Sequence, residues 1–178
     1  MTFARDYLLP PAPKISIQYK ADDDERGSAA MLVADRAEGE GEQYRPVIGA
    51  LVLVVDADDA LRESLVRVLA ECDMTALGAA SRLEALDILR RTQVDVIVAD
   101  QFIRGLDGVA LLSDVRQRWP HVRRILFMGD PAADIVLDAV NRAGVHKVLL
   151  RNMHAVRIRD EIESVGLAAL RERRELCR

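Results

Sequence analysis

Two aspartates and one arginine each follow an apolar run: Asp56 after ALVLVV, Asp100 at the end of VDVIVAD, and Arg151 after VHKVLL. Two further acids, Asp58 and Asp59, come almost directly after the first run. Carboxylates are hard ligands of the kind that Mg²⁺ prefers, and they can also act as nucleophiles. The same groups can form a structural ion pair with an arginine. Any shared chemistry requires a fold that brings these side chains together.

The elements that must position them alternate between short apolar runs and helical periodicity. Continuous, β-branched runs are typical of parallel strands that are buried on both faces. We expect five such strands, at residues 50–55, 74–80, 94–100, 123–129 and 145–150. Five strand-then-helix units predict an α/β fold with a doubly wound parallel sheet. Ligands bind at the carboxyl ends of such strands, where Asp56, Asp100, Met128 and Arg151 stand.

The helices carry their own start and stop signals. Ser81, with Glu84 three residues later, predicts a capping box. Gly144 predicts a left-handed C-cap. The last amphipathic helix is interrupted at Gly166, which we interpret as a soft joint because glycine is unfavourable inside a helix. We therefore expect the segment from Leu167 to Cys177 to project beyond the domain and to pair with a second copy or a partner.

Composition narrows the class of protein. The net charge of −4 and the pI near 5.4 argue against a direct nucleic-acid binder. No apolar run reaches the length of about 20 residues that a membrane span needs, and the N-terminus does not resemble a signal peptide. The two cysteines match no metal or redox spacing. We expect a cytoplasmic protein that contacts neither nucleic acid nor membrane.

Residues 1–48 differ from the rest of the chain. They are rich in acids and prolines and poor in apolar side chains, so disorder of an acidic N-terminal tail is the primary prediction. The alternation in KISIQYK (Lys14–Lys20) indicates an exposed strand as the alternative. The domain itself is expected at residues 49–178, with an extended C-terminal helix.

Three segments together resemble the receiver domain of bacterial two-component response regulators. VLVVDADD is similar to the family's first strand with its acids, and DQFIRGLDG to its phosphoacceptor loop. VHKVLLRN is similar to the fifth-strand segment, which ends in lysine-proline in the family. The resemblance covers about 125 residues and implies a five-stranded, flavodoxin-like sheet in the order 2-1-3-4-5.

The resemblance also implies a role for each site residue. Asp100 stands at the phosphoacceptor position, and Asp56 is the first acid of the metal-binding pair. Ala57 replaces the second acid, Met128 replaces a hydroxyl residue, and Arg151 replaces the lysine. Arg104 and Val148 stand where the family usually has a proline and an aromatic residue. These departures predict an atypical, degenerate site at which Asp56 and Asp100 bind Mg²⁺ only weakly. Asp58 and Asp59 are better suited to cap the following helix than to replace the missing ligand.

We therefore predict a stand-alone atypical receiver that signals mainly by protein–protein contact. The residues after Leu150 are too few for an output domain. Slow phosphorylation of Asp100 in a phosphorelay is an alternative, and a flavodoxin-like nucleotide or cofactor binder is a third hypothesis. No enzymatic activity beyond self-phosphorylation is expected. The expected partners are a histidine kinase, a phosphotransfer protein or an output protein, with a homodimer through the C-terminal helix as a further possibility.

Overall fold

The computed structural model describes residues 49–72, 74–104 and 106–176, together with the backbone of three shorter segments at 14–19, 30–35 and 45–46. The chain divides into two compact units, Met1–Pro46 and Val47–Arg178. Each unit is described by itself below.

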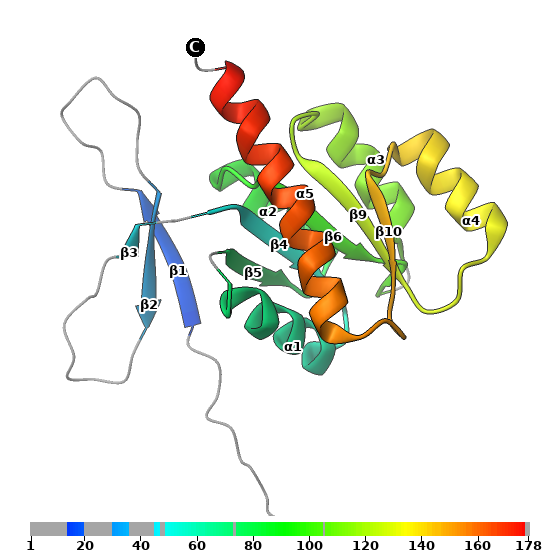
Figure 1. Cartoon of the computed structure of the whole chain (residues 1–178), viewed down its shortest axis with the longest axis horizontal. Coiled ribbons are helices and arrows are strands. Elements are labelled where there is room, and N and C mark those ends of the chain that lie inside the picture. Colours follow the sequence, from blue (N-terminus) through cyan, green and yellow to red (C-terminus); the bar gives the residue numbers. More distant parts are fainter. Residues whose placement is uncertain are drawn as a thin grey trace, which may run out of the picture. The chain divides into compact units, whose positions relative to one another are not determined.

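The second unit contains the predicted parallel sheet (Figure 1). Its strands lie in the order β5-β4-β6-β9-β10, and every neighbouring pair is parallel. Numbered along the domain, this order is 2-1-3-4-5, so the prediction is confirmed. The strands are β4 (Leu51–Val55), β5 (Thr75–Ala79), β6 (Val96–Asp100), β9 (Arg123–Met128) and β10 (Lys147–Leu150).

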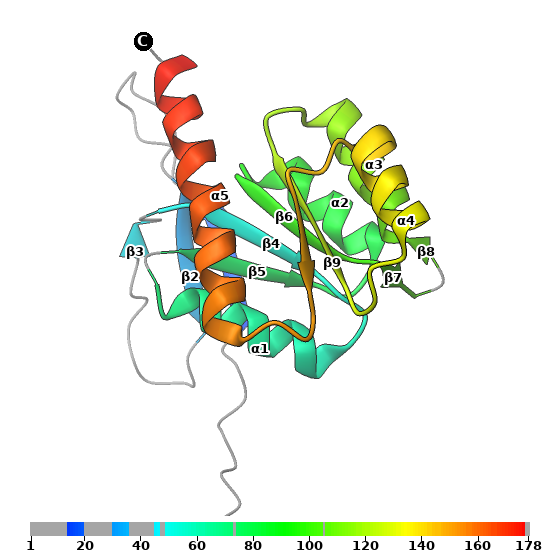
Figure 2. The same ribbon diagram turned by 45° about the vertical axis from the view of Figure 1, so that its right-hand side comes forward.

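Helices cover both faces of this sheet (Figures 1 and 2). One face carries α1 and α5, and the other carries α2, α3 and the helix formed by α4 with the π-helical turn η1. A short hairpin, β7 with β8, lies in the loop after β6. The bounds are α1 (Asp59–Ala70), α2 (Arg82–Arg91), β7 (Phe102–Ile103), β8 (Leu106–Asp107), α3 (Gly108–Arg118), α4 (Ala133–Asp138), η1 (Ala139–Ala143) and α5 (Ala155–Leu176).

The core explains why the two central strands are so apolar. Every residue of β4 and β6 is buried, because helices pack on both sides of them. On the side of α1 and α5, Val52 and Val54 meet Leu69 and Ile162 in one hydrophobic cluster. Each fully buried aliphatic side chain of this kind contributes about 1.5–3 kcal/mol relative to exposure. The predicted site residues Asp56 and Asp100 stand at the carboxyl ends of these two buried strands.

Local capping follows the sequence signals closely. The Ser81 hydroxyl accepts a hydrogen bond from the Glu84 N–H at 3.2 Å, and the Glu84 carboxylate accepts one from the Ala80 N–H at 2.8 Å. Gly144 has a φ of 55° and ends the η1 turn in the left-handed conformation. The N-cap at Ser81 and the C-cap at Gly144 are confirmed, and the Glu84 side chain differs from a standard capping box in bonding the N–H one residue before the N-cap.

Arg124 holds the end of the η1 turn. It rises from β9, is only 6% exposed, and donates hydrogen bonds to the carbonyl oxygens of Ala143 at 3.0 Å, Val122 at 2.6 Å and Gly144 at 3.2 Å. The carbonyls of Ala143 and Gly144 lie at the negative end of the helix dipole, where a cation is favourable, whereas that of Val122 directly precedes β9. The buried guanidinium thus satisfies backbone groups that the ends of the helix leave unpaired.

The C-terminal helix differs from the prediction. It runs without a break from Ala155 to Leu176, and residues on both sides of Gly166 are buried. A Cβ at Gly166 would lie 2.8 Å from the Cβ of Ala50. The glycine therefore permits close packing of helix against sheet, and the interpretation as a soft joint is wrong. Arg173 and Glu172 contact the domain, so the prediction that the segment after Gly166 projects beyond it is wrong for these residues. Pairing of this helix with a second copy or a partner stays a prediction. Cys177 lies outside the described residues.

The first unit contains a three-stranded antiparallel sheet in the order β1-β2-β3, with bounds Lys14–Tyr19, Ala30–Asp35 and Arg45–Pro46. In these segments the structure departs from the prediction of disorder. Two short runs of strand-forming residues, KISIQY and AMLVAD, pair over six positions, and the average polarity of the tail concealed the second of them. The β1 strand corresponds to the alternation noted in KISIQYK. The rest of residues 1–48 lies outside the described residues.

Candidate functional site

The predicted site residues do converge at the carboxyl edge of the sheet. Asp56 follows β4 and Asp100 ends β6, and these neighbouring strands place the two acids side by side. Both are almost completely buried, with exposed fractions of 3% and 5%. Arg151 follows β10 and reaches across the edge to them. Its Nη2 atom lies 2.6 Å from Oδ1 of Asp100 and 3.2 Å from Oδ2 of Asp56.

Arg151 is held in this position from two further directions. Its backbone N–H donates a hydrogen bond to the carbonyl oxygen of Met128 at 2.8 Å, at the end of the neighbouring strand. Its guanidinium carbon lies 5.8 Å from the ring centre of Phe127, a cation–π contact. The side chain is 34% exposed, so the guanidinium lies between solvent and the two buried carboxylates. A single nitrogen thus bridges both acids.

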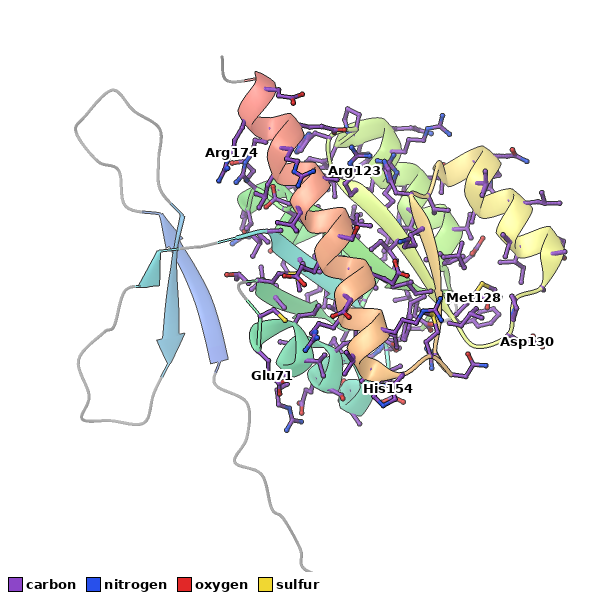
Figure 3. The ribbon with its side chains drawn as sticks, viewed as in Figure 1. Glu71, Arg123, Met128, Asp130, His154 and Arg174 are labelled. Carbon is purple, nitrogen blue, oxygen red and sulfur yellow. The ribbon has the colours of Figure 1, made fainter. Side chains whose placement is uncertain are left out.

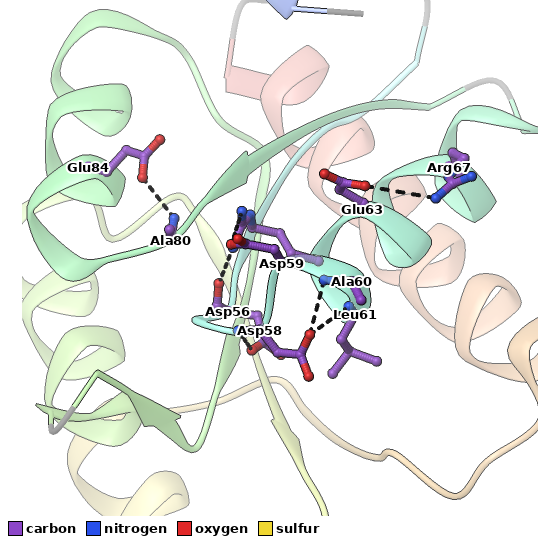
Figure 4. Close-up of polar contacts among 10 residues, drawn as sticks. Asp56, Asp58, Asp59, Ala60, Leu61, Glu63, Arg67, Ala80 and Glu84 are labelled. Carbon is purple, nitrogen blue, oxygen red and sulfur yellow. Dashed lines mark hydrogen bonds and ion pairs between the residues drawn. The ribbon is translucent and has the colours of Figure 1, made fainter. Parts of the chain in front are cut away.

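Asp56 is fixed by its own turn as well. Its Oδ1 accepts a hydrogen bond from the Asp58 N–H at 2.9 Å. Its carbonyl oxygen accepts one from Nη1 of Arg62, at 2.7 Å (Figure 4). Burial raises the pKa of Asp56 above its usual value, and the negative charge of Asp100 raises it further. The Asp58 N–H and the charge of Arg151 act in the opposite direction.

The two acids after Asp56 are occupied elsewhere. Asp58 is the N-cap of α1, and its Oδ1 accepts hydrogen bonds from the N–H groups of Ala60 at 3.0 Å and Leu61 at 3.1 Å (Figure 4). Asp59 forms an ion pair with Arg62 at 2.7 Å. The capping role expected for Asp58 is therefore the one observed. In the expected family arrangement a third carboxylate would stand at Ala57, which has no ligand atom in its side chain.

The arrangement lacks the ligand set of a strong Mg²⁺ site. Across residues 49–72, 74–104 and 106–176, no group of three or more His, Cys, Asp or Glu side chains is placed to hold a metal ion. Mg²⁺ requires oxygen ligands in near-octahedral geometry. Here the carboxylate oxygens of Asp56 and Asp100 face the guanidinium of Arg151. The carbonyl oxygen of Asp56 faces the guanidinium of Arg62. Two arginines thus supply positive charge around Asp56.

Met128, at the predicted hydroxyl position, ends β9 at this edge of the sheet (Figure 3). It is fully buried, and its thioether has no hydrogen to donate. The phosphoryl oxygens of a modified Asp100 would therefore find no hydroxyl donor from this strand. Val148, at the usual aromatic position, lies within β10.

The loop after Asp100 is shaped by backbone contacts. A Cβ at Gly108 would lie 1.9 Å from the carbonyl oxygen of Asp100, so only glycine fits there. The β7–β8 hairpin turns at Arg104, whose φ of 42° is a conformation that proline cannot adopt. The Phe102 N–H donates a hydrogen bond to Oδ2 of Asp100 at 3.2 Å. Both carboxylate oxygens of Asp100 thus have a partner.

Sequence reasoning missed two members of this site. Arg62 lies in the first turns of α1, and its spacing of three from Asp59 could have indicated an ion pair but not the contact with Asp56. Phe127 precedes Met128 in an apolar strand, and no local signal connects it with Arg151. Such contacts between strands depend on the register of the sheet.

The comparisons with known proteins agree with this fold. A model of the response regulator receiver domain matches residues 52–163. The hydrogenase transcriptional regulatory protein HoxA of Cupriavidus necator is 36% identical over 122 residues, which are 66% of this chain and 25% of that protein. The response regulator protein FleR of Pseudomonas aeruginosa is 30% identical over 123 residues, 69% of this chain and 26% of FleR. The chain thus spans about a quarter of the length of these relatives.

Solved structures show the same fold. The signal receiver domain of an HD domain-containing protein from Pseudomonas fluorescens Pf-5 aligns with a TM-score of 0.66 and 23% identity, over 71% of this chain and 93% of that one. Because the family model matches more than half of the residues, the chain belongs to the response regulator receiver domain family of two-component signalling. The hypothesis of a flavodoxin-like nucleotide or cofactor binder outside this family is accordingly dropped. In the described part of the chain, no helix is both long and apolar enough to span a membrane.

Proposed function

We propose that this chain is an atypical receiver that acts mainly through protein–protein contact in two-component or phosphorelay signalling. The observation that carries the proposal is the position of Arg151, whose Nη2 bridges Asp56 and Asp100 at the carboxyl edge of the sheet. Phosphoryl transfer to Asp100 needs a free carboxylate oxygen and a metal ion or other cations that neutralise the incoming group. In this site the guanidinium of Arg151 is already paired with the two carboxylates.

The surrounding residues support the same conclusion. Oδ1 of Asp100 faces Arg151, and Oδ2 accepts the Phe102 N–H. Met128 has no donor for a phosphoryl oxygen, and Ala57 has no ligand for a metal ion. Any binding of Mg²⁺ is therefore proposed to be weak. Output then depends on what the folded surface contacts: a histidine kinase, a phosphotransfer protein or an output protein.

Intact-mass spectrometry after incubation with acetyl phosphate and Mg²⁺ tests the proposal. The wild-type chain should keep its mass under conditions in which a rebuilt variant, with Ala57→Asp, Met128→Thr and Arg151→Lys, gains one phosphoryl group. Asp100→Asn in the rebuilt background is the control for the site of addition. Rapid and complete modification of the wild type would refute the proposal.

Slow phosphorylation of Asp100 is the second candidate, and one observation favours it. The carboxylate keeps its position at the end of β6, and Arg151 places a permanent cation 2.6 Å from it. This cation could attract a phosphodonor as well as hold the acid. The same experiment separates the two functions: partial modification over hours that Asp100→Asn abolishes would support the second candidate.

A further inference from the structure

A third buried carboxylate lies at the opposite end of the sheet from Asp56 and Asp100. Asp95 directly precedes β6 and is 5% exposed. Its Oδ2 accepts a hydrogen bond from the N–H of Leu51, the first residue of β4, at 2.8 Å. Its Oδ1 accepts one from Nη1 of Arg173, near the end of α5, also at 2.8 Å. One side chain thus joins the starts of two central strands to the last turns of the C-terminal helix.

A second ion pair fixes the same part of the helix to a third strand. Arg123, the first residue of β9, forms a salt bridge with Glu172. Figure 3 shows Arg123 beside the last turns of α5 and Met128 at the other end of the same strand. Glu172 and Arg173 are adjacent in sequence, so the two ion pairs hold one turn of the helix at two points.

Close packing brings the helix near enough for these contacts. At Gly166 the helix approaches the sheet so closely that a Cβ would meet that of Ala50 at 2.8 Å. Val165 and Ala169, on the same side of the helix, are buried. The small side chains at this contact allow the helix to pack closely against the start of β4. The ion-paired residues lie one to two turns further along the helix. The family match ends at residue 163, so the helix residues that make these contacts lie beyond it, whereas Asp95 and Arg123 lie within it.

We propose that residues 164–176 of α5 form a latch, closed by the pairs Arg173–Asp95 and Glu172–Arg123, that controls whether the end of the helix is held or free. Closing the latch keeps the face with Val165, Ala169 and Arg173 against the sheet. Opening it separates the carboxylate of Asp95 from its side-chain cation, which disfavours the open state. Because the pairs are ionic, their loss should open the helix end locally while the core strands stay folded.

Hydrogen exchange measured by mass spectrometry on the full chain tests the latch. Arg173→Gln should reduce the protection of amides in residues 167–176 by about tenfold, since it removes a charged hydrogen bond. The matched control is Arg174→Gln, which changes the neighbouring exposed arginine of the same helix and should leave protection unchanged. Peptides from the centre of β9 should keep their protection in both variants.

A charge exchange tests the second pair, and its double variant keeps the net charge of the wild type. Arg123→Glu and Glu172→Arg should each reduce protection of the helix end, and the double variant should recover most of it. Equal protection in Arg173→Gln and Arg174→Gln, or additive losses in the double variant, would show that apolar contacts alone hold the helix. Either result overturns the latch and leaves the proposed function untouched, because the latch does not rest on it.

Discussion

Removal of the Arg151 side chain is the most direct perturbation of the acidic site. Arg151→Ala leaves Asp56 and Asp100 buried side by side without a shared cation. Breaking a fully buried ion pair costs about 3–5 kcal/mol, and an exposed pair contributes about 0–1 kcal/mol. With 34% of its side chain exposed, Arg151 lies between these limits. We expect a loss of about 2–3 kcal/mol at pH 7, or about 10 °C in Tm for a domain of this size.

The pH dependence has a definite sign. Burial and the charge of Asp100 raise the folded-state pKa of Asp56, so its ionisation destabilises the fold as the pH rises from the unfolded value of 3.8 through the folded pKa. Arg151 acts against this rise, and its removal should raise the pKa further. The difference in Tm between variant and wild type should therefore grow with pH. It should be small in acid, where Asp56 is protonated in both proteins.

Magnesium should distinguish the counter-cation role from simple loss of packing. With the guanidinium gone, Mg²⁺ should stabilise Arg151→Ala by about 1.4 kcal/mol at ten times its Kd and leave the wild type nearly unchanged. Thermal melts in MgCl₂, against NaCl of equal ionic strength, measure this. Arg159→Ala, which breaks the exposed pair with Asp160, is the matched control. If both variants lose equal stability and neither responds to Mg²⁺, Arg151 is not the counter-cation of the site.

Four further changes test separate parts of the structure. Asp56→Asn should raise Tm by a few degrees at pH 7, because it removes a buried charge with a raised pKa, and melts at acidic pH should show the gain disappear. Ala57→Asp should strengthen Mg²⁺ binding in calorimetric titration, and no gain would mean that loop geometry is the defect. Arg124→Met should cost about 3 kcal/mol in urea unfolding, since buried carbonyl oxygens lose their donor. Gly108→Ala should cost about 3 kcal/mol in the same assay, because its Cβ would collide with a backbone oxygen.

The sheet and the convergence of the site were predictable because both follow from local patterns and general connection rules. Buried parallel strands need continuous apolar runs, and right-handed crossovers then determine which strand ends meet. Asp56, Asp100, Met128 and Arg151 each stand at the end of such a run, so their common edge follows from the fold. The departures from the family pattern at Ala57, Met128 and Arg151 were equally visible, because they are side-chain identities, and the degenerate chemistry that they predict is part of the proposed function.

Contacts between distant segments were not predictable in the same way. Arg173 and Asp95 are separated by 78 residues, and no local pattern connects them. Helix propensity describes a residue without its neighbours, so Gly166 was interpreted as a weak point of the helix. The structure shows instead that a glycine is needed there because Ala50 lies so close. The β7–β8 hairpin has strands of only two residues, too short for a period of alternation to be detected.

The glycine after Asp107 has a consequence for how such proteins are found in genomes. Its place beside the Asp100 carbonyl oxygen is a demand of space, and a chain that had lost all capacity for phosphoryl transfer would still have to meet it. A search that recognises receivers by their aspartate-glycine loop therefore detects the fold. It finds members that cannot be phosphorylated together with those that can. To separate the two groups, a search must also examine the residues that align with Ala57, Met128 and Arg151 of this chain, because those positions serve the reaction and not the fold.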